Sequence, residues 1–450
     1  MIFRLLLVLI ALLPLPIASV YPWTWSAMAV VVAFLLIAFV ASIRSIDARH
    51  LPRLRRLALP VLSFFVVAFF AALQMDTHLP AKFHNPLWQA TADSLNISIK
   101  GAISIAPDET GSALMRLLTY AGIFWIALHY CRSPKLARQT IYVLVATGFA
   151  YATYGLFIEL TQSRLILWFD KTSYMTDLTS TFVNRNSYAT YAGFGLVCCT
   201  ALLLELINNA QRTGLTPRER TLRLTQAMTE HGWLFVVAWL VMSTALLFTH
   251  SRAGLASTVL GLVALLATFA AAPGTRIRVF LATATPLLIA GIALLAFSGE
   301  VVTERLIETD IENVGRLRAY ELSLEAIAAN PLFGTGYGTF EDAFHAYRDE
   351  TLPAVFDKAH NTYLENALEL GIPAVAILLV SLGTLLVQCV IGARSRRRDT
   401  VYPCIGVGAT VLLAAHSLVD FSAQIPAVAA TYALIMGVAV AQSWRTSKAS

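Results

Sequence analysis

The residues of this sequence that are best suited to chemistry are one histidine and two arginines beside long apolar runs. His360 comes just before a run that begins near Thr362, and an imidazole can gain or lose a proton near neutral pH, as a general base must. Arg185 comes just before the run 187–207, and Arg252 lies in THSRAG between two runs. A guanidinium presents forked donors that fit a phosphate or a carboxylate. Together these side chains indicate proton abstraction next to a bound anion.

Each of the three also has a structural interpretation. Arg252 could extend along the membrane to reach headgroup phosphates, and a lone histidine at a membrane edge is more often structural than catalytic. Arg185 could anchor the helix that follows, with Asn186 or Ser187 as its N-cap. A cation at the positive end of a helix dipole is unfavourable unless an anion lies nearby, so capping alone does not explain Arg185.

Four further polar residues lie near the ends of other apolar runs. Thr362 and Glu365 fit the T-x-x-E capping box, so Glu365 is expected to have a structural role at a helix start. His416 and Asp420 are four residues apart and would share one face of a helix near its end. That pair is either a polar contact within the helix or an orienting pair beside a site, and the sequence leaves both open.

The elements that must position these residues are membrane-spanning helices. Hydrophobic residues make up 57% of the 450 residues and charged residues only 13%, whereas soluble proteins average roughly 45–50% and roughly 25%. A spanning helix needs about 20 mostly apolar residues. About twelve runs meet that need, and the first is interpreted as a retained helix rather than a signal peptide. The runs are 3–20, 25–43, 57–75, 115–131, 139–160, 187–207, 232–249, 253–272, 279–297, 362–391, 402–419 and 425–443.

Lysine and arginine predict the orientation of this all-α, polytopic membrane bundle. If the N-terminus is cytoplasmic and the runs alternate, every short inside segment is basic; the segment 44–56, for example, carries five arginines. The net charge of +6 therefore marks the cytoplasmic face and does not indicate nucleic acid. Residues 76–114, 161–186 and 298–361 would lie outside. Apolar residues at helical spacing predict that the last of these segments is a helical loop.

The expected organisation has three parts. Residues 1–297 would form a bundle of nine spans, 298–361 a large outside loop, and 362–450 three further spans with a short cytoplasmic tail. GTGYGTF at 334–340 does not follow a strand, so it is expected to be a tight turn that packs the loop against the spans rather than a nucleotide site. The cysteines lie within or beside apolar runs and no acidic cluster suits a divalent cation, so neither a metal nor another cofactor is expected.

Several of these segments together resemble the O-antigen ligase and polymerase superfamily. They occur in the order and spacing of that family and cover about 180–430. The segments are TFVNRNSYATY, THSRAG, GRLRAYELSLEAIAANPLFGTGYGTF, AHNTYLENALELGIPA and HSLVDFSAQIPA. The resemblance implies a membrane glycosyltransferase bundle of the GT-C type, with its active site at the periplasmic face of the bacterial inner membrane.

The resemblance also implies the substrates and the roles of particular residues. The donor would be a glycan on undecaprenyl diphosphate, and the acceptor a hydroxyl of lipid A–core or of another glycan, both held among membrane lipids. The essential arginines of the family correspond to Arg185 and Arg252, and its essential histidine to His360. Arg316 and Arg318 are secondary candidates, because the sequence between Arg318 and His360 is less tightly patterned. Arginine rather than Mg²⁺ would then balance the diphosphate charge, so the enzyme is expected to be metal-independent.

Three functions are compatible with these observations. The first is a glycan ligase that transfers to lipid A–core, and the second is a polysaccharide or O-antigen polymerase of the same superfamily. The third is a secondary transporter, a different class that also has about twelve spans. Transporters usually show broken helices and coupling acids near the membrane midplane. Here the candidate residues are expected at the outer edge, which favours the enzyme.

Overall fold

The computed structural model describes residues 1–43, 56–210, 216–273, 315–348, 356–396 and 398–444. The predicted span 279–297 and the first part of the predicted loop, 298–314, lie outside these residues. Over the part that is described, the chain is helical apart from one short antiparallel hairpin, in which β1 (Leu165–Ile166) pairs with β2 (Phe169–Asp170). The all-α prediction is therefore confirmed.

Most of the predicted apolar runs form helices that are long enough to cross a membrane. The long apolar helices are α2 (Pro22–Ile43), α5 (Pro107–Tyr130), α6 (Pro134–Leu160), α7 (Arg185–Ala210), α8 (Pro217–Ala227) continued through η5 (Met228–Gly232) into α9 (Trp233–Phe248), α10 (Arg252–Ala270) and α15 (Ile372–Ser395). Shorter apolar helices are α1 (Ile2–Leu12), α3 (Ala58–Gln74), α16 (Val401–His416) and α17 (Pro426–Ala441). The chain is a polytopic helical membrane protein.

Two predicted spans are shorter than the apolar runs suggested. The run 3–20 is helical only as far as Leu12, because Pro14 and Pro16 follow and cannot continue the hydrogen-bond ladder. The run 362–391 divides at Gly371 into α14 (Thr362–Leu370) and α15. Gly371 has a φ of 77°, and a Cβ there would lie 2.4 Å from the carbonyl oxygen of Leu332, so only glycine fits this turn.

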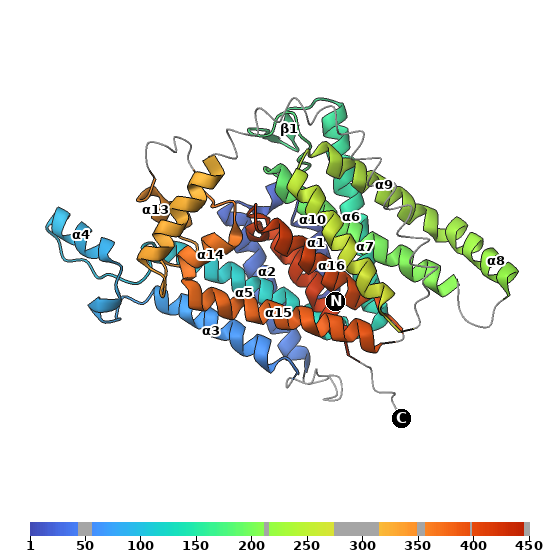
Figure 1. Ribbon diagram of the computed structural model, residues 1–450, viewed down its shortest axis with the longest axis horizontal. Coiled ribbons are helices and arrows are strands. Elements are labelled where there is room, and N and C mark those ends of the chain that lie inside the picture. Colours follow the sequence, from blue (N-terminus) through green and yellow to red (C-terminus); the bar gives the residue numbers. More distant parts are fainter. Residues whose placement is uncertain (44–55, 211–215, 274–314, 349–355, 397, 445–450) are drawn as a thin grey trace.

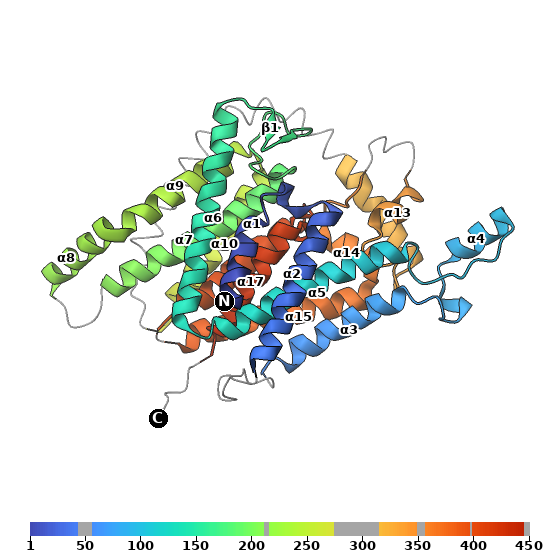
Figure 2. The same cartoon turned by 180° about the vertical axis from the view of Figure 1, so that it is seen from behind.

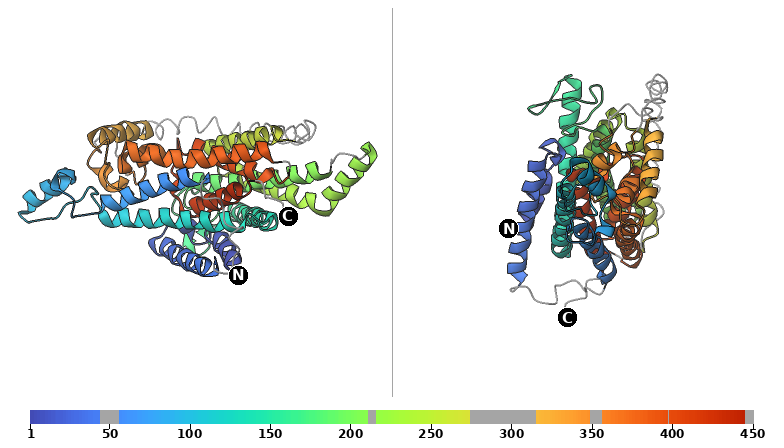
Figure 3. Two further views of the ribbon diagram at one scale, coloured as in Figure 1. Left: turned by 90° about the horizontal axis from the view of Figure 1, so that it is seen from below. Right: turned by 90° about the vertical axis from the view of Figure 1, so that its left-hand side faces the viewer.

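The helices pack in layers around α16 and α17, which lie at the centre of the bundle (Figure 1). Small residues allow close approach here: a Cβ on Gly261 of α10 would lie 2.7 Å from the carbonyl oxygen of Gly408 in α16. Seen from behind, α2 crosses α5, and α3 lies beside α15 (Figure 2). Helices α1 and α2 form an outer layer on the opposite side of α5 from α15 (Figure 3).

The two ends of the bundle carry different residues. Helices α7 and α10 begin at the end where α16 finishes, because Asn186 at the start of α7 contacts both Ser251 and Asp420. The opposite end of α7 holds Glu205, which pairs with Arg138 at 2.6 Å. At about 1.5 Å per residue, the 20 residues from 185 to 205 separate these two ends by about 30 Å.

The Gly-rich segment 334–340 packs the described part of the predicted loop against the bundle, as the sequence predicted. Gln74 at the end of α3 donates to the carbonyl oxygens of Phe333 (2.8 Å) and Glu369 (2.9 Å) and accepts from the backbone N–H of Tyr337 (3.0 Å). Gly336 has a φ of 115°, and a Cβ there would lie 2.3 Å from Ser104 Oγ. The helix at 315–329, α13 (Phe340–His345) and α14 share a small apolar core around Phe340 and Phe344.

Replacing Gly336 by alanine should destabilise this junction, because the new Cβ would meet Ser104 and the residue would keep an unfavourable φ. We expect the midpoint of thermal unfolding in detergent to fall by several degrees. Gly383→Ala is the matched control, since a Cβ there meets nothing within 4 Å and alanine favours the helix. Equal midpoints for the two variants would show that the turn does not need glycine.

Candidate functional site

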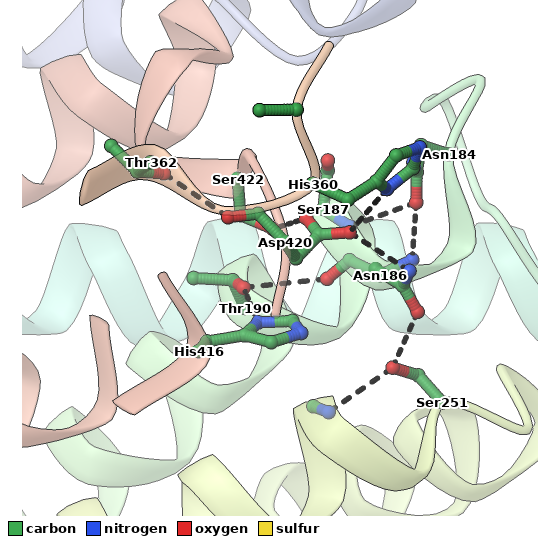
Figure 4. Close-up of polar contacts among 12 residues, drawn as sticks. Asn184, Asn186, Ser187, Thr190, Ser251, His360, Thr362, His416, Asp420 and Ser422 are labelled. Carbon is green, nitrogen blue, oxygen red and sulfur yellow. Dashed lines mark hydrogen bonds and ion pairs between the residues drawn. The ribbon is translucent and has the colours of Figure 1, made fainter. Parts of the chain in front are cut away.

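The side chain of Asn186 connects three segments that are far apart in the sequence (Figure 4). Its Nδ2 donates to Asp420 Oδ2 at 2.9 Å, and its Oδ1 accepts from Ser251 Oγ at 2.7 Å. Ser251 in turn caps α10, because its Oγ accepts from the backbone N–H of Gly254 at 3.1 Å. One buried amide therefore fixes the start of α7, the start of α10 and the segment after α16 relative to one another.

His360 lies beside this network in a strained backbone conformation. Its φ is 51°, a left-handed value that is uncommon for residues other than glycine and is found most often at functional sites. The carbonyl oxygen of His360 accepts from Tyr320 Oη at 2.9 Å. Its imidazole stands edge-on to the ring of Phe421, with 5.0 Å between ring centroids. Nδ1 of His360 lies 3.9 Å from Asp420 Oδ2, which is an ion-pair distance rather than a hydrogen bond.

Asp420 is fully buried and is held as a carboxylate by polar contacts. Ser422 Oγ donates to its Oδ1 at 2.5 Å, and Thr362 Oγ1 donates to its backbone oxygen at 3.1 Å. Burial by itself would raise the pKa of Asp420, but the contacts with His360, His416 and Ser422 outweigh burial and leave the pKa below its ordinary value. The negative charge next to His360 is therefore present at neutral pH.

The expectation that one helix carries both His416 and Asp420 is wrong, but the two residues still interact electrostatically. Helix α16 ends at His416, so Asp420 lies beyond the last turn and does not share a helix face with it. His416 Nδ1 lies 2.6 Å from Thr190 Oγ1, whereas Asp420 faces Asn186 and His360. Both residues are buried at this end of the bundle, but the residue that Asp420 can orient is His360.

Arg185 is paired with a carboxylate that the sequence analysis did not identify. Its Nη1 donates to Asp177 Oδ2 at 2.7 Å, and the guanidinium lies 5.2 Å from the centre of the Tyr174 ring. Asp177 Oδ1 also lies 2.8 Å from Nδ1 of His250. Asp177 is thus the anion that a cation at the start of α7 requires. The only sequence signals were an acid in the loop before Arg185 and a histidine inside THSRAG.

The cap of α7 is Asn184, two residues before Asn186 and three before Ser187, the two predicted caps. Asn184 Oδ1 accepts from the backbone N–H groups of Asn186 (2.7 Å) and Ser187 (3.4 Å), so neither Asn186 nor Ser187 caps the helix. Because Asn184 satisfies these N–H groups, the side chain of Asn186 can make its contacts across the bundle instead.

Arg252 is the first residue of α10 and is exposed at the same end of the bundle. It follows Ser251, whose side chain both caps α10 and contacts Asn186. The positive end of a helix dipole and its N–H groups favour an anion in this position. The two predicted arginines therefore stand at the starts of two helices that Asn186 ties together.

Of the two secondary arginines, Arg316 affects residues of the network through its charge, whereas Arg318 pairs with an acid of its own helix. Both belong to the helix at 315–329, in which Tyr320 contacts His360. The charge of Arg316 acts electrostatically on Tyr320 and on His416. Arg318 instead pairs with Glu321 at 2.9 Å in an exposed contact.

Glu365 supports the segment before His360, but the predicted capping box does not form. Asn361 is the N-cap, because its Oδ1 accepts from the N–H groups of the next residues of α14, at 3.0 and 3.1 Å. Glu365 Oε2 accepts from the backbone N–H of Ala359 at 3.0 Å, and its Oε1 lies 3.3 Å from Lys358 Nζ. Burial would lower the pKa of Lys358, but the carboxylates of Glu365 and Glu369 raise it overall. Two contacts therefore fix the backbone next to His360.

Within the described residues, no group of three or more histidine, cysteine, aspartate or glutamate side chains could hold a metal ion. The charged groups of the site are instead arginines, buried carboxylates and histidines.

The comparison with family models gives one match. Residues 237–379 match a family model described as O-Antigen ligase. The matched segment contains Arg252, His360 and Glu365, together with Arg316 and Arg318, whereas Arg185, His416 and Asp420 lie outside it. A search among curated proteins found no match. This chain is a multi-pass membrane protein whose residues 237–379 match the O-antigen ligase family model, in agreement with its resemblance to the O-antigen ligase and polymerase superfamily.

Proposed function

We propose that the protein is an O-antigen ligase-like glycosyltransferase that moves a glycan from undecaprenyl diphosphate to a hydroxyl of lipid A–core. The O-antigen ligase domain indicates transfer between a lipid-linked glycan and an acceptor in a membrane. One observation carries the finer proposal. The side chain of Asn186 joins the starts of α7 and α10, which carry Arg185 and Arg252, to Asp420. Asp420 in turn lies beside His360.

In this proposal His360 acts as the general base. The acceptor oxygen attacks the anomeric carbon, and its proton passes to the imidazole. The bond between that carbon and the diphosphate oxygen breaks, and undecaprenyl diphosphate leaves with the electron pair. Asp420, 3.9 Å from Nδ1, favours the imidazolium that results. A single displacement of this kind inverts the anomeric carbon.

Arg185 and Arg252 would hold the diphosphate as its negative charge increases. Donors that are already aimed at the developing charge need little rearrangement, and partly buried surroundings strengthen their effect. The side chain of Arg185 is only 20% exposed, and its contact with Asp177 fixes the direction of the guanidinium. Arg252 adds a second cation at the start of α10.

The site is proposed to face the periplasm of the bacterial inner membrane. Arg138 and Arg396 lie at the opposite end of the bundle, where Arg396 Nη1 donates to the carbonyl oxygens of Gln442 (2.7 Å) and Trp444 (2.8 Å). Positive residues are usually retained in the cytoplasm. The end that carries His360 is then the periplasmic end.

A clean deletion in the native host tests this function, with lipid A–core and undecaprenyl diphosphate-linked glycans analysed by mass. We expect finished polymer to accumulate on the lipid carrier while the core remains bare. Single repeat units on the core or the carrier, with loss of long chains, would instead identify a polymerase. No change in either pool would contradict glycan transfer altogether.

Chelation should leave the reaction unchanged, because the arginines supply the positive charge that a divalent cation would otherwise provide. We expect the same transfer rate in EDTA as in buffer when the purified protein is assayed with a lipid-linked donor. A rate that is lost in EDTA and returns only with added Mg²⁺ would reject this part of the mechanism.

Replacing Asp420 by asparagine should lower the transfer rate about tenfold or more, because His360 loses the adjacent negative charge. Asp399→Asn is the matched control, because Asp399 pairs with Arg396 at the opposite end. An equal loss in both variants would reduce Asp420 to a structural role.

A further inference from the structure

The segment between α6 and α7 forms a polar pocket that the proposed mechanism does not use. The pocket has a volume of about 160 Å³ and is lined by the end of α6 and by residues on either side of the β1–β2 hairpin. The hairpin itself is labelled β1 at the upper edge of Figure 1. Its polar lining consists of Glu159, Gln162, Ser163, Arg164 and Lys171.

The lining of this pocket combines hydrogen-bond donors and acceptors over a small area. Glu159 supplies a carboxylate, Arg164 a guanidinium and Gln162 an amide that can both donate and accept. Lys171 Nζ donates to the backbone oxygen of Asp177 at 2.7 Å, and an ammonium has two further donors. A sugar ring fits such a set, because each hydroxyl both donates and accepts. Met175 adds an apolar wall suited to the C–H face of the ring.

An exposed aromatic ring stands on the hairpin whose base, at Arg164 and Lys171, lines the pocket. Trp168 is 72% exposed and lies between β1 and β2, and its ring centroid is 5.6 Å from that of Phe169. Phe169 contacts Tyr21 at 6.0 Å, which anchors the hairpin to the N-terminal helices. An indole offers a flat apolar face together with one N–H donor, a combination that suits the alternating C–H and O–H groups of a sugar.

The same short segment lines the pocket and holds the proposed diphosphate site. Lys171 and Met175 belong to the pocket, whereas Tyr174 lies under the guanidinium of Arg185 and Asp177 pairs with it at 2.7 Å. The bond from Lys171 to the Asp177 backbone joins the two parts directly. A glycan that enters the pocket would therefore lie next to the reacting phosphate.

We propose that this pocket and Trp168 form a sugar-binding subsite for one of the two glycan substrates. The inference rests on the proposed function. It adds a site that binds a sugar ring close to the bond that reacts. Stacking on Trp168 and hydrogen bonds to Gln162 and Arg164 hold the ring. The ring belongs either to the donor glycan or to the acceptor glycan. The substrate whose KM rises in the variants is the one that binds here.

The test uses the full-length protein in liposomes, with an undecaprenyl diphosphate-linked glycan as donor and lipid A–core as acceptor. Trp168→Ala and Gln162→Ala should each raise the KM of one substrate about tenfold and leave kcat nearly unchanged. Trp233→Ala is the matched control, since Trp233 is also exposed (52%) but begins α9, remote from the pocket. A selective rise for the acceptor assigns the subsite to the acceptor glycan, and a rise for the donor assigns it to the donor glycan.

Different results would overturn the sugar-binding subsite and the proposed function. Wild-type protein that transfers glycan, together with Trp168 and Gln162 variants that keep both KM values, would overturn the subsite alone. A Trp168→Ala protein that inserts less stably but keeps both KM values would overturn it as well, and would assign the ring to the membrane interface. Wild-type protein that transfers nothing would overturn the proposed function and the subsite with it.

Discussion

Replacing His360 by asparagine is expected to abolish most glycan transfer while leaving the protein folded in the membrane. Asparagine tolerates the left-handed backbone conformation of this position, where φ is 51°, but it cannot accept a proton. General-base catalysis typically contributes about 10²–10⁴-fold, so a loss of that size is expected in kcat. His360→Ala should lose as much activity, with some additional strain in the backbone.

The control for this experiment is His345→Ala in α13, because His345 is exposed and belongs to the same outer part of the chain. Size-exclusion chromatography in detergent should give the same profile for all three variants and the wild type. A His360→Asn protein that folds normally and retains more than about a tenth of the wild-type rate would remove His360 from the role of base.

Replacing Arg252 by lysine is expected to lose most activity although the positive charge is retained. Arg252 is the first residue of α10 and follows the cap residue Ser251, so the start of the helix fixes its position. An ammonium is a point charge and cannot reproduce two parallel hydrogen bonds to a phosphate. We expect kcat/KM for the lipid-linked donor to fall about tenfold to a hundredfold, since each charge-assisted hydrogen bond contributes roughly 1.5–3 kcal/mol.

Arg318→Lys provides the matched control for Arg252, because it makes the same change from guanidinium to ammonium at a residue that forms an exposed pair with Glu321. That variant should keep nearly the full rate. Near wild-type transfer by Arg252→Lys would contradict a diphosphate role for Arg252 and would favour contact with lipid headgroups instead.

The sequence predicted the helices well because lipid leaves the backbone few alternatives. Long apolar runs must form helices to satisfy their own N–H and C=O groups, so α6, α7 and α10 could be placed from composition alone. The same reasoning placed Arg185 and Arg252 at helix starts. The break at Gly371 was missed because the length of the apolar run was given more weight than Gly371 and Pro373, although a glycine followed closely by a proline is a signal for a helix end.

Contacts between distant segments could not be predicted from one sequence. Asn186 was assigned as a possible cap because it begins an apolar run, yet its side chain joins Ser251 to Asp420, and Asn184 caps the helix. Local patterns place a cap only to within one or two residues. Asp177 was overlooked because nothing near it in the sequence shows that it faces Arg185 and His250.

His360 was named as a candidate from the sequence, but Asp420 was considered only together with His416. Spacing alone placed Asp420 with His416, on the assumption that the helix continued. The helix ends at His416, and the turn that follows carries Asp420 towards His360 instead. The partner of a buried carboxylate just beyond a helix can therefore be predicted only when the last residue of that helix is known.

The most direct test of the account is a single-turnover assay in liposomes that hold only the purified protein, an undecaprenyl diphosphate-linked glycan and lipid A–core. The account predicts one glycan joined to the core for each undecaprenyl diphosphate released, and no such product with His360→Asn. Release of the lipid diphosphate without any glycan on the core, or equal product from the His360→Asn protein, would contradict it.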